Sequence, residues 1–168
     1  MKRFLQTIAI LGAATATAVA AEPGPACAPI LKAMAKTLMA DHASLTQSNG
    51  QTMKGITAGG VNYLQIENVW KVSPLSPKDN QSRSDENLQN AKTYVCQSVP
   101  DSIIDGVPVA NYRTRTETED AVIESKIAIS KASGLAIEVD NDLAGEGNKS
   151  HYSTRYTYER IHAPTVQK

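Results

Sequence analysis

The sequence predicts an α+β domain built on a curved antiparallel β-sheet, and two observations carry this prediction. One amphipathic helical segment comes first, and a succession of short segments follows in which apolar and polar residues alternate. The turns between these segments are too short for the helical crossovers that parallel strands require. A helix followed by a meander of strands is typical of the α+β class.

The first helix is expected from Pro29 to just before Ser44. Proline is favoured at the first helical position, because its fixed φ suits the helix and its missing N–H costs nothing there. Apolar residues then recur at helical spacing, so one face of this helix packs on the sheet. These apolar residues are Ile30, Leu31, Met34, Leu38 and Met39.

Two hairpins are predicted after this helix. Ser48-Asn49-Gly50 forms the first turn, since Asn-Gly favours the left-handed dihedrals of tight hairpins. Glu67-Asn68 forms the second turn, and short connections make the joined strands antiparallel neighbours. The expected strands are residues 43–47, 51–57, 61–66 and 69–73.

A second, short and polar helix is expected over residues 78–91, with Leu88 as its thin apolar edge. The strands that follow show apolar residues on one face and charged residues on the other, which indicates a sheet with one solvated side. The acidic, glycine-rich residues 140–149 are expected to form a loop before the last strand. The expected strands are residues 93–99, 107–116 and 121–130, a segment with Leu135, Ile137 and Val139, and a final strand with Tyr152, Tyr156 and Tyr158.

Residues 1–21 are predicted to be a signal peptide. Lys2 and Arg3 precede an uncharged run that ends in small residues, and cleavage is expected near Ala20-Ala21. A transmembrane anchor is the alternative, but polar residues such as Gln6 dilute the run. The mature chain, residues 22–168, is expected to form a single periplasmic domain, with an extracellular location as the alternative.

Charge excludes two classes of partner for the mature chain. The full sequence has 17 basic and 17 acidic residues, and removal of Lys2 and Arg3 leaves a net charge of about −2. No basic patch for nucleic acid and no polybasic run for an anionic membrane are present. The sequence therefore predicts no nucleic-acid partner and no integral membrane span after cleavage.

Cys27 and Cys96 are the two cysteines of the chain, and export predicts a disulfide between them. A redox pair would normally show Cys-x-x-Cys, and a metal site would need more ligands. Lipidation of Cys27 is a further alternative, but Gly24-Pro25-Ala26 lacks the apolar residue that a lipobox places three positions upstream.

Motifs for catalysis, metal binding and cofactors are missing from the sequence. It contains no Gly-x-Ser-x-Gly, His-Glu-x-x-His, Walker or Rossmann pattern. Asp140-Asn141-Asp142 resembles the start of a calcium loop but fails at Ala144 and at His151. The sequence therefore predicts no catalytic residues, no metal and no cofactor.

Several blocks of the mature chain carry strand-and-turn signatures: Ile127–Leu135, Lys149-Ser150-His151, Thr154-Arg155-Tyr156, Tyr63–Ile66 and Trp70–Pro74. In these blocks the chain resembles periplasmic proteins of the LolA/LolB lipoprotein-carrier superfamily. The resemblance implies an N-terminal helix across an open half-barrel, whose concave apolar face holds acyl chains. A concave sheet is a common place for a small apolar ligand.

The leading functional hypothesis is a non-enzymatic periplasmic binding or carrier protein for a lipid or lipoprotein acyl chain. The alternative is an envelope interaction module that docks a partner protein through a sheet edge or the segment 78–91. A hydrolase with an unrecognised site is a third hypothesis. The residues expected to face the ligand cavity are Met34, Leu38, Leu64, Ile66, Trp70 and Ile127.

Overall fold

The computed structural model describes residues 23–145 and 147–166, so the predicted signal peptide lies outside the described residues. The helical elements are the 3-10 turn η1 (Pro25–Cys27) and the helices α1 (Ala28–Met39) and α2 (Pro77–Gln89). The strands are β1 (His42–Ser48), β2 (Gln51–Ala58), β3 (Val61–Ile66), β4 (Val69–Val72), β5 (Thr93–Ile104), β6 (Val107–Glu117), β7 (Ala121–Ser130), β8 (Ala136–Gly145) and β9 (Asn148–Thr157).

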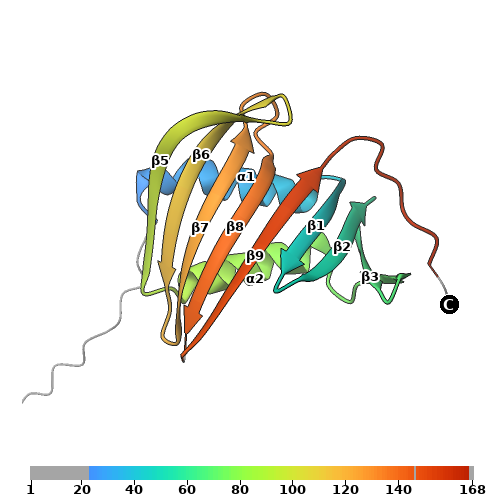
Figure 1. Ribbon diagram of the computed structural model, residues 1–168, viewed down its shortest axis with the longest axis horizontal. Helices are drawn as coiled ribbons and strands as arrows, with labels where there is room; N and C mark the ends of the chain where they lie inside the picture. The colour runs from blue at the N-terminus through green and yellow to red at the C-terminus, as the bar shows by residue number, and fades with distance from the viewer. Residues whose placement is uncertain (1–22, 146, 167–168) are drawn as a thin grey trace, which may run out of the picture.

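Within the described ranges, nine strands form one sheet in the order β4-β3-β2-β1-β9-β8-β7-β6-β5 (Figure 1). All neighbouring strands are antiparallel. The pairing of β1 with β9 joins strands from opposite ends of the chain. β4 and β5 are free edges, so the sheet stays open, and the predicted α+β half-barrel is confirmed.

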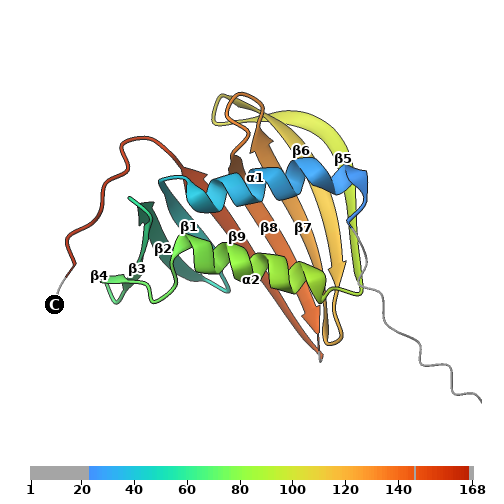
Figure 2. The same cartoon turned by 180° about the vertical axis from the view of Figure 1, so that it is seen from behind.

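Both helices lie side by side across one face of the sheet, which curves around them (Figure 2). We call this covered face the inner face and the opposite one the outer face. Ile30, Ala33 and Thr37 are buried on α1, and their spacing of three and four residues forms one stripe toward the sheet. The hydroxyl of Thr37 accepts a hydrogen bond of 2.9 Å from the Ala136 N–H, which fixes α1 against the start of β8.

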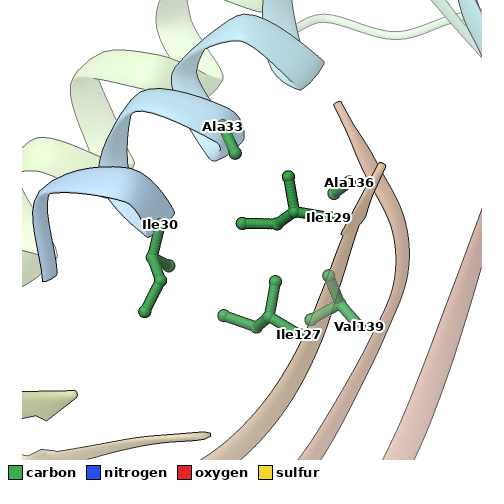
Figure 3. Close-up of a cluster of buried hydrophobic side chains, with 6 residues drawn as sticks. All are labelled: Ile30, Ala33, Ile127, Ile129, Ala136 and Val139. Carbon is green, nitrogen blue, oxygen red and sulfur yellow. The ribbon is translucent and has the colours of Figure 1, made fainter. Parts of the chain in front are cut away.

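The core is a cluster of small and branched apolar residues between α1 and the inner face of β7 and β8 (Figure 3). Ile30 is fully buried there, and removal of such a side chain from water stabilises the fold by roughly 1.5–3 kcal/mol. Met34, Tyr112 and Tyr156 pack around the cluster. The buried members are Ile30, Ala33, Ile127, Ile129, Ala136 and Val139.

The second helix begins at a capping box and is polar along its length. The Asp79 N–H donates to the Ser76 hydroxyl at 3.2 Å, and the Ser76 N–H donates to the Asp79 carboxylate at 2.8 Å. The Ser76 hydroxyl also donates to the Asp79 carboxylate at 2.7 Å, and this bond, followed by the one from the Ser76 N–H, lowers the pKa of the Asp79 carboxyl. Pro77 is buried and Leu88 is half-buried, so α2 has only the thin apolar edge that the sequence predicts.

A disulfide joins Cys27 to Cys96, with Cα atoms 5.2 Å apart. Cys27 ends η1 immediately before α1, and Cys96 lies on the edge strand β5. The bond closes a loop over a sequence separation of 69 residues, which is worth about 2–4 kcal/mol. It therefore fixes the start of α1 to one edge of the sheet.

Local turn chemistry explains the two N-terminal hairpins. Asn49 has a φ of 49° and Gly50 a φ of 77°, which are the left-handed values that this tight turn requires. Glu67 and Asn68 also have positive φ, at 49° and 65°. Both predicted hairpins are confirmed.

The prediction of a loop over residues 140–149 is wrong. β8 continues to Gly145 and β9 begins at Asn148. Asp142 points from the outer face, and its carboxylate lies 2.8 Å from the Nδ1 atom of His151 on the neighbouring strand. Strand propensity depends on the face that a side chain occupies, and on a solvated face an aspartate is tolerated within a well-paired strand.

The length of β5 also differs from the prediction. This strand runs past the predicted end at Val99 to Ile104. A shift of register between Val99 and Ser102 accommodates Pro100, which cannot donate a ladder hydrogen bond. The result is a long edge strand in which Ile103 is 71% exposed.

Candidate ligand-binding cavity

The two faces of the sheet differ sharply in charge. In β6–β9 the register places all charged side chains of the described residues on the outer face. The inner face of the same strands carries apolar, hydroxyl, amide and phenol groups. The outer charged residues are Arg113, Arg115, Glu117, Glu124, Lys126, Glu138, Asp140, Asp142, Lys149, His151 and Arg155.

A cavity of about 750 Å³ lies between the two helices and the inner face. This volume is within the range of roughly 300–1,000 Å³ that is typical of small-molecule sites. Its walls come from α1, α2, β5–β9 and the β6–β7 turn. Six apolar side chains, from α1 and the sheet, form one part of the wall: Ile30, Leu31, Met34, Ile123, Ile127 and Val139.

The polar part of the wall carries hydrogen-bonding groups without positive charge. No lysine or arginine lines the cavity among the described residues. Glu119 and Asp120, on the β6–β7 turn, are its carboxylates, and both are exposed. Burial raises the pKa of the Tyr94 phenol, which also lines the cavity.

The helix α2 contributes a thin polar cover. Ser84, Asn87 and Leu88 line the cavity from α2, and Asn90 lines it just beyond the helix. Leu88 is the side chain through which this helix adds apolar surface. The cavity therefore has an apolar wall on the α1 side and a polar one on the α2 side.

Two of the six residues predicted to face a ligand line this cavity. Met34 reaches it from α1 and Ile127 from β7. Ile127 points toward α1 beside Val139 (Figure 3). Leu38 is half-buried on α1 and is not part of the cavity wall.

The other three predicted residues lie at the far edge of the sheet. Leu64 and Ile66 on β3 are 44% and 48% exposed and are not part of the cavity wall. Trp70 pairs with Gln65 on β3, and the alternation along a strand places both on the face opposite to Leu64 and Ile66. The structure therefore does not bring the six residues together.

Polar lining residues were not among the predicted site residues. Thr114, Ser125, Asn141 and Tyr152 all line the cavity. The sequence contains a signal for one of them, because alternation places Ser125 between Ile123 and Ile127 on the apolar face of its strand. A lone serine on an apolar face is a weak signal, since it has no motif around it.

A second cluster of inner-face side chains lies beyond the cavity, where α1 ends. The Nδ1 atom of His42 is 2.8 Å from the Ala40 carbonyl, and its ring packs edge-on against Tyr156 at 5.4 Å. Burial lowers the pKa of His42, against the opposing effects of the Ala40 carbonyl and the Asp41 carboxylate. Burial also raises the pKa of Tyr158, to about 12, and the phenol donates to the Ala136 carbonyl. This cluster joins β1, β9 and α1.

In residues 23–145 and 147–166, no three His, Cys, Asp or Glu side chains gather in a group that could hold a metal ion. Neither α1 nor α2 has the length and apolar character needed to cross a lipid bilayer.

Comparisons with known proteins show similarity in structure alone. No protein-family model matches the sequence, and no curated protein matches it. The crystal structure of the Mycobacterium tuberculosis lipoprotein LppX aligns with 82% of this chain and 97% of its own, at a TM-score of 0.50 and 8% identity. LprF from Mycobacterium bovis aligns with 88% of this chain and 99% of its own, at a TM-score of 0.49 and 8% identity.

A third solved structure, MucB in complex with MucA(peri), aligns with 82% of this chain and 60% of its own, at a TM-score of 0.44 and 13% identity. At such identities the likeness concerns the arrangement of the backbone and not the chemistry of the site. An open nine-stranded sheet around two helices, together with the alignment to LppX, shows that the described part of this chain has the LolA-like fold.

Proposed function

We propose that this protein is a non-enzymatic carrier or binding protein of the bacterial periplasm, with residues 22–168 as its single mature domain. The ligand is an amphipathic molecule with an apolar chain, such as a lipid or a lipoprotein acyl group. The observation that carries the proposal is the cavity of about 750 Å³ between the helices and the inner face of β6–β9, where the described residues place no charged side chain. Binding of an acyl chain there is favourable, because its apolar surface is removed from water.

The apolar wall supports an elongated chain as the occupant. Leu31, Met34 and Ile123 are half-buried and present apolar surface to the cavity, whereas Ile30, Ile127 and Val139 pack together in the core behind them. Burial of a ligand's apolar surface against these side chains is worth about 25 cal/mol per Å². The disulfide supports an oxidising compartment, in agreement with export.

The proposal is tested with the uncharged fluorescent probe N-phenylnaphthylamine and with two tryptophan variants of one strand. Ile123→Trp fills the cavity from the inner face, and we expect it to weaken probe binding at least tenfold. Lys126→Trp is the matched control, because its side chain points from the outer face of the same strand. Both variants are compared only after circular dichroism confirms a folded sheet.

Mass spectrometry of gently purified mature protein gives an independent measurement. We expect acyl-chain species to be recovered with the wild-type protein and to be depleted in Ile123→Trp. A wild-type protein that yields no lipid and does not bind the probe contradicts the proposal.

A second candidate function rests on the edge strand β5. Val95 is 60% exposed and Ile103 is 71% exposed on this strand, and an unpaired edge is a template for an added strand from another chain. A stoichiometric partner recovered from envelope extract, and lost when Pro replaces Gln97 on β5, would favour this function over that of a carrier.

A further inference from the structure

Four neutral polar side chains form a continuous row across the inner face. Thr114 on β6 pairs with Ser125 on β7, Ser125 pairs with Asn141 on β8, and Asn141 pairs with Tyr152 on β9. Paired residues of antiparallel strands point to the same face, so the four side chains lie side by side. All four line the cavity. We call them the polar row.

The polar row has unused hydrogen-bonding capacity. The Ser125 hydroxyl donates to the Asn141 Oδ1 atom at 2.7 Å, and this bond leaves both amide N–H groups of Asn141 available. No hydrogen bond joins the amide nitrogen of Asn141, the hydroxyl of Thr114 or the phenol of Tyr152 to another described residue. Thr114 is 6% exposed as a residue and lines the cavity.

Apolar walls flank the polar row. Ile123 and Ile127 precede and follow Ser125 on the same face of β7, and Val139 precedes Asn141 on β8. Ile127 and Val139 project toward α1 and the apolar core (Figure 3). A ligand that covers both regions needs a hydrocarbon part against the isoleucines and a hydrogen-bonding part over the row.

The charged residues of the cavity wall indicate which polar head group a ligand can have. The cavity wall offers no lysine or arginine among the described residues, and its carboxylates are Glu119 and Asp120 at the β6–β7 turn. An anionic group there would lose its hydration without gaining a cationic partner, and burial of an unpaired charge is strongly unfavourable. A neutral hydroxyl group, by contrast, can both accept from Asn141 and donate to nearby oxygens, and an ester group can accept from Asn141.

From these observations we infer that the polar row selects an acyl ligand with an uncharged, hydroxyl-bearing head group and discriminates against fatty-acid and phosphate head groups. This inference rests on the proposed function, because it assigns the head-group end of the same cavity. Glu119 and Asp120 are exposed to water, so their screened charge does not provide a buried site for an amine.

Three ligands with the same oleyl or oleoyl chain test the inference by displacement of N-phenylnaphthylamine at pH 8.5. Glyceryl monooleate has a neutral diol head, oleate is an anion, and oleylamine is a cation. We expect glyceryl monooleate to compete at least tenfold more strongly than the other two. Equal or tighter binding of oleate or oleylamine overturns the inference but leaves the carrier proposal standing, whereas a protein that fails to bind N-phenylnaphthylamine contradicts the carrier proposal itself.

Variants of the polar row connect this selectivity to named side chains. Asn141→Leu removes the available amide donors, and we expect it to reduce the affinity for glyceryl monooleate about tenfold relative to the affinity for oleate. Asp140→Asn, its neighbour on the outer face, is the matched control and should leave both affinities unchanged. Thr114→Val is a near-isosteric second variant that tests the same row if Asn141→Leu does not fold. Unchanged selectivity in a folded row variant overturns the inference.

Discussion

The inner and outer faces of strands β6–β9 share one backbone and use opposite chemistry. Ion pairs hold the outer face, including Arg115–Glu124 and Arg155–Glu138, each at 2.7 Å. Arg115, Glu124 and Arg155 are about half exposed or more, and Glu138 is 25% exposed, so the Arg115–Glu124 pair in particular contributes little to stability. Apolar contacts with α1 hold the inner face, where burial contributes more than surface charge. Adjacent residues of one strand therefore differ in what they contribute to the fold.

The largest effect is expected in the core under α1. Ile30 is fully buried, and Ile30→Ala should lower the free energy of unfolding by about 2–5 kcal/mol, because it removes packing and leaves a cavity. Urea denaturation measures this loss. Val95→Ala on the outer face of β5, with its side chain 60% exposed, is the control and should change stability by less than about 0.5 kcal/mol. Equal losses in both variants would contradict the contrast between the faces.

A slightly smaller effect is expected for the disulfide. Replacement of Cys27 and Cys96 by alanine should cost about 2–4 kcal/mol, since the unfolded chain regains the freedom that the bond removes. Denaturation of the wild-type protein with and without reductant measures the same quantity. The double alanine variant is the control, and its stability should not respond to reductant.

Acidification should lower the free energy of unfolding through protonation of His42 on the inner face. Burial lowers the pKa of this histidine below its ordinary value of 6.5, so the unfolded chain takes up a proton that the folded chain excludes. The free energy of unfolding should be highest above pH 6.5 and should fall as the pH drops from 6.5 through the folded pKa. Denaturation series across this window measure the slope, and His42→Gln should flatten it. His162→Gln, at an exposed histidine of the C-terminal tail, is the control and should keep the wild-type slope.

The smallest effect is expected for an outer-face ion pair. A double-mutant cycle with Arg115→Ala and Glu124→Ala should give a coupling free energy of about 0.2–1 kcal/mol, because both side chains are more than half exposed. The coupling should shrink in high salt. A coupling of several kcal/mol would mean that the outer face contributes to stability as strongly as the inner face.

Local signals explain which parts of the fold could be predicted. Asn49-Gly50 determines a turn through its own dihedral preferences, and the isoleucines of β7 reveal a buried face by their spacing. The aspartates of β8 misled the prediction, since their place in a strand depends on partners such as His151 across the sheet. Such pairing is tertiary information, and local propensity does not contain it.

The site was predicted less well for a related reason. Composition and spacing identify apolar residues such as Leu64 and Ile127, but they do not say which part of the inner face the helices cover. α1 and α2 enclose a cavity over β5–β9, and Leu64, on β3, is not part of its wall. The polar row was missed because its members come from four strands and meet only through register.

The pairing of β1 with β9 has a consequence for how the chain folds. Ala43 lies opposite Thr157, so the middle of the sheet is completed by segments from near the two ends of the described chain. A chain that emerges from its N-terminus forms the β1–β4 hairpins early, yet the hydrogen-bonding edge of β1 stays uncovered until the last strand arrives. Such long-range pairing slows folding and exposes a strand edge to aggregation in the interval. We therefore expect a truncation before β9 to leave an aggregation-prone half-sheet.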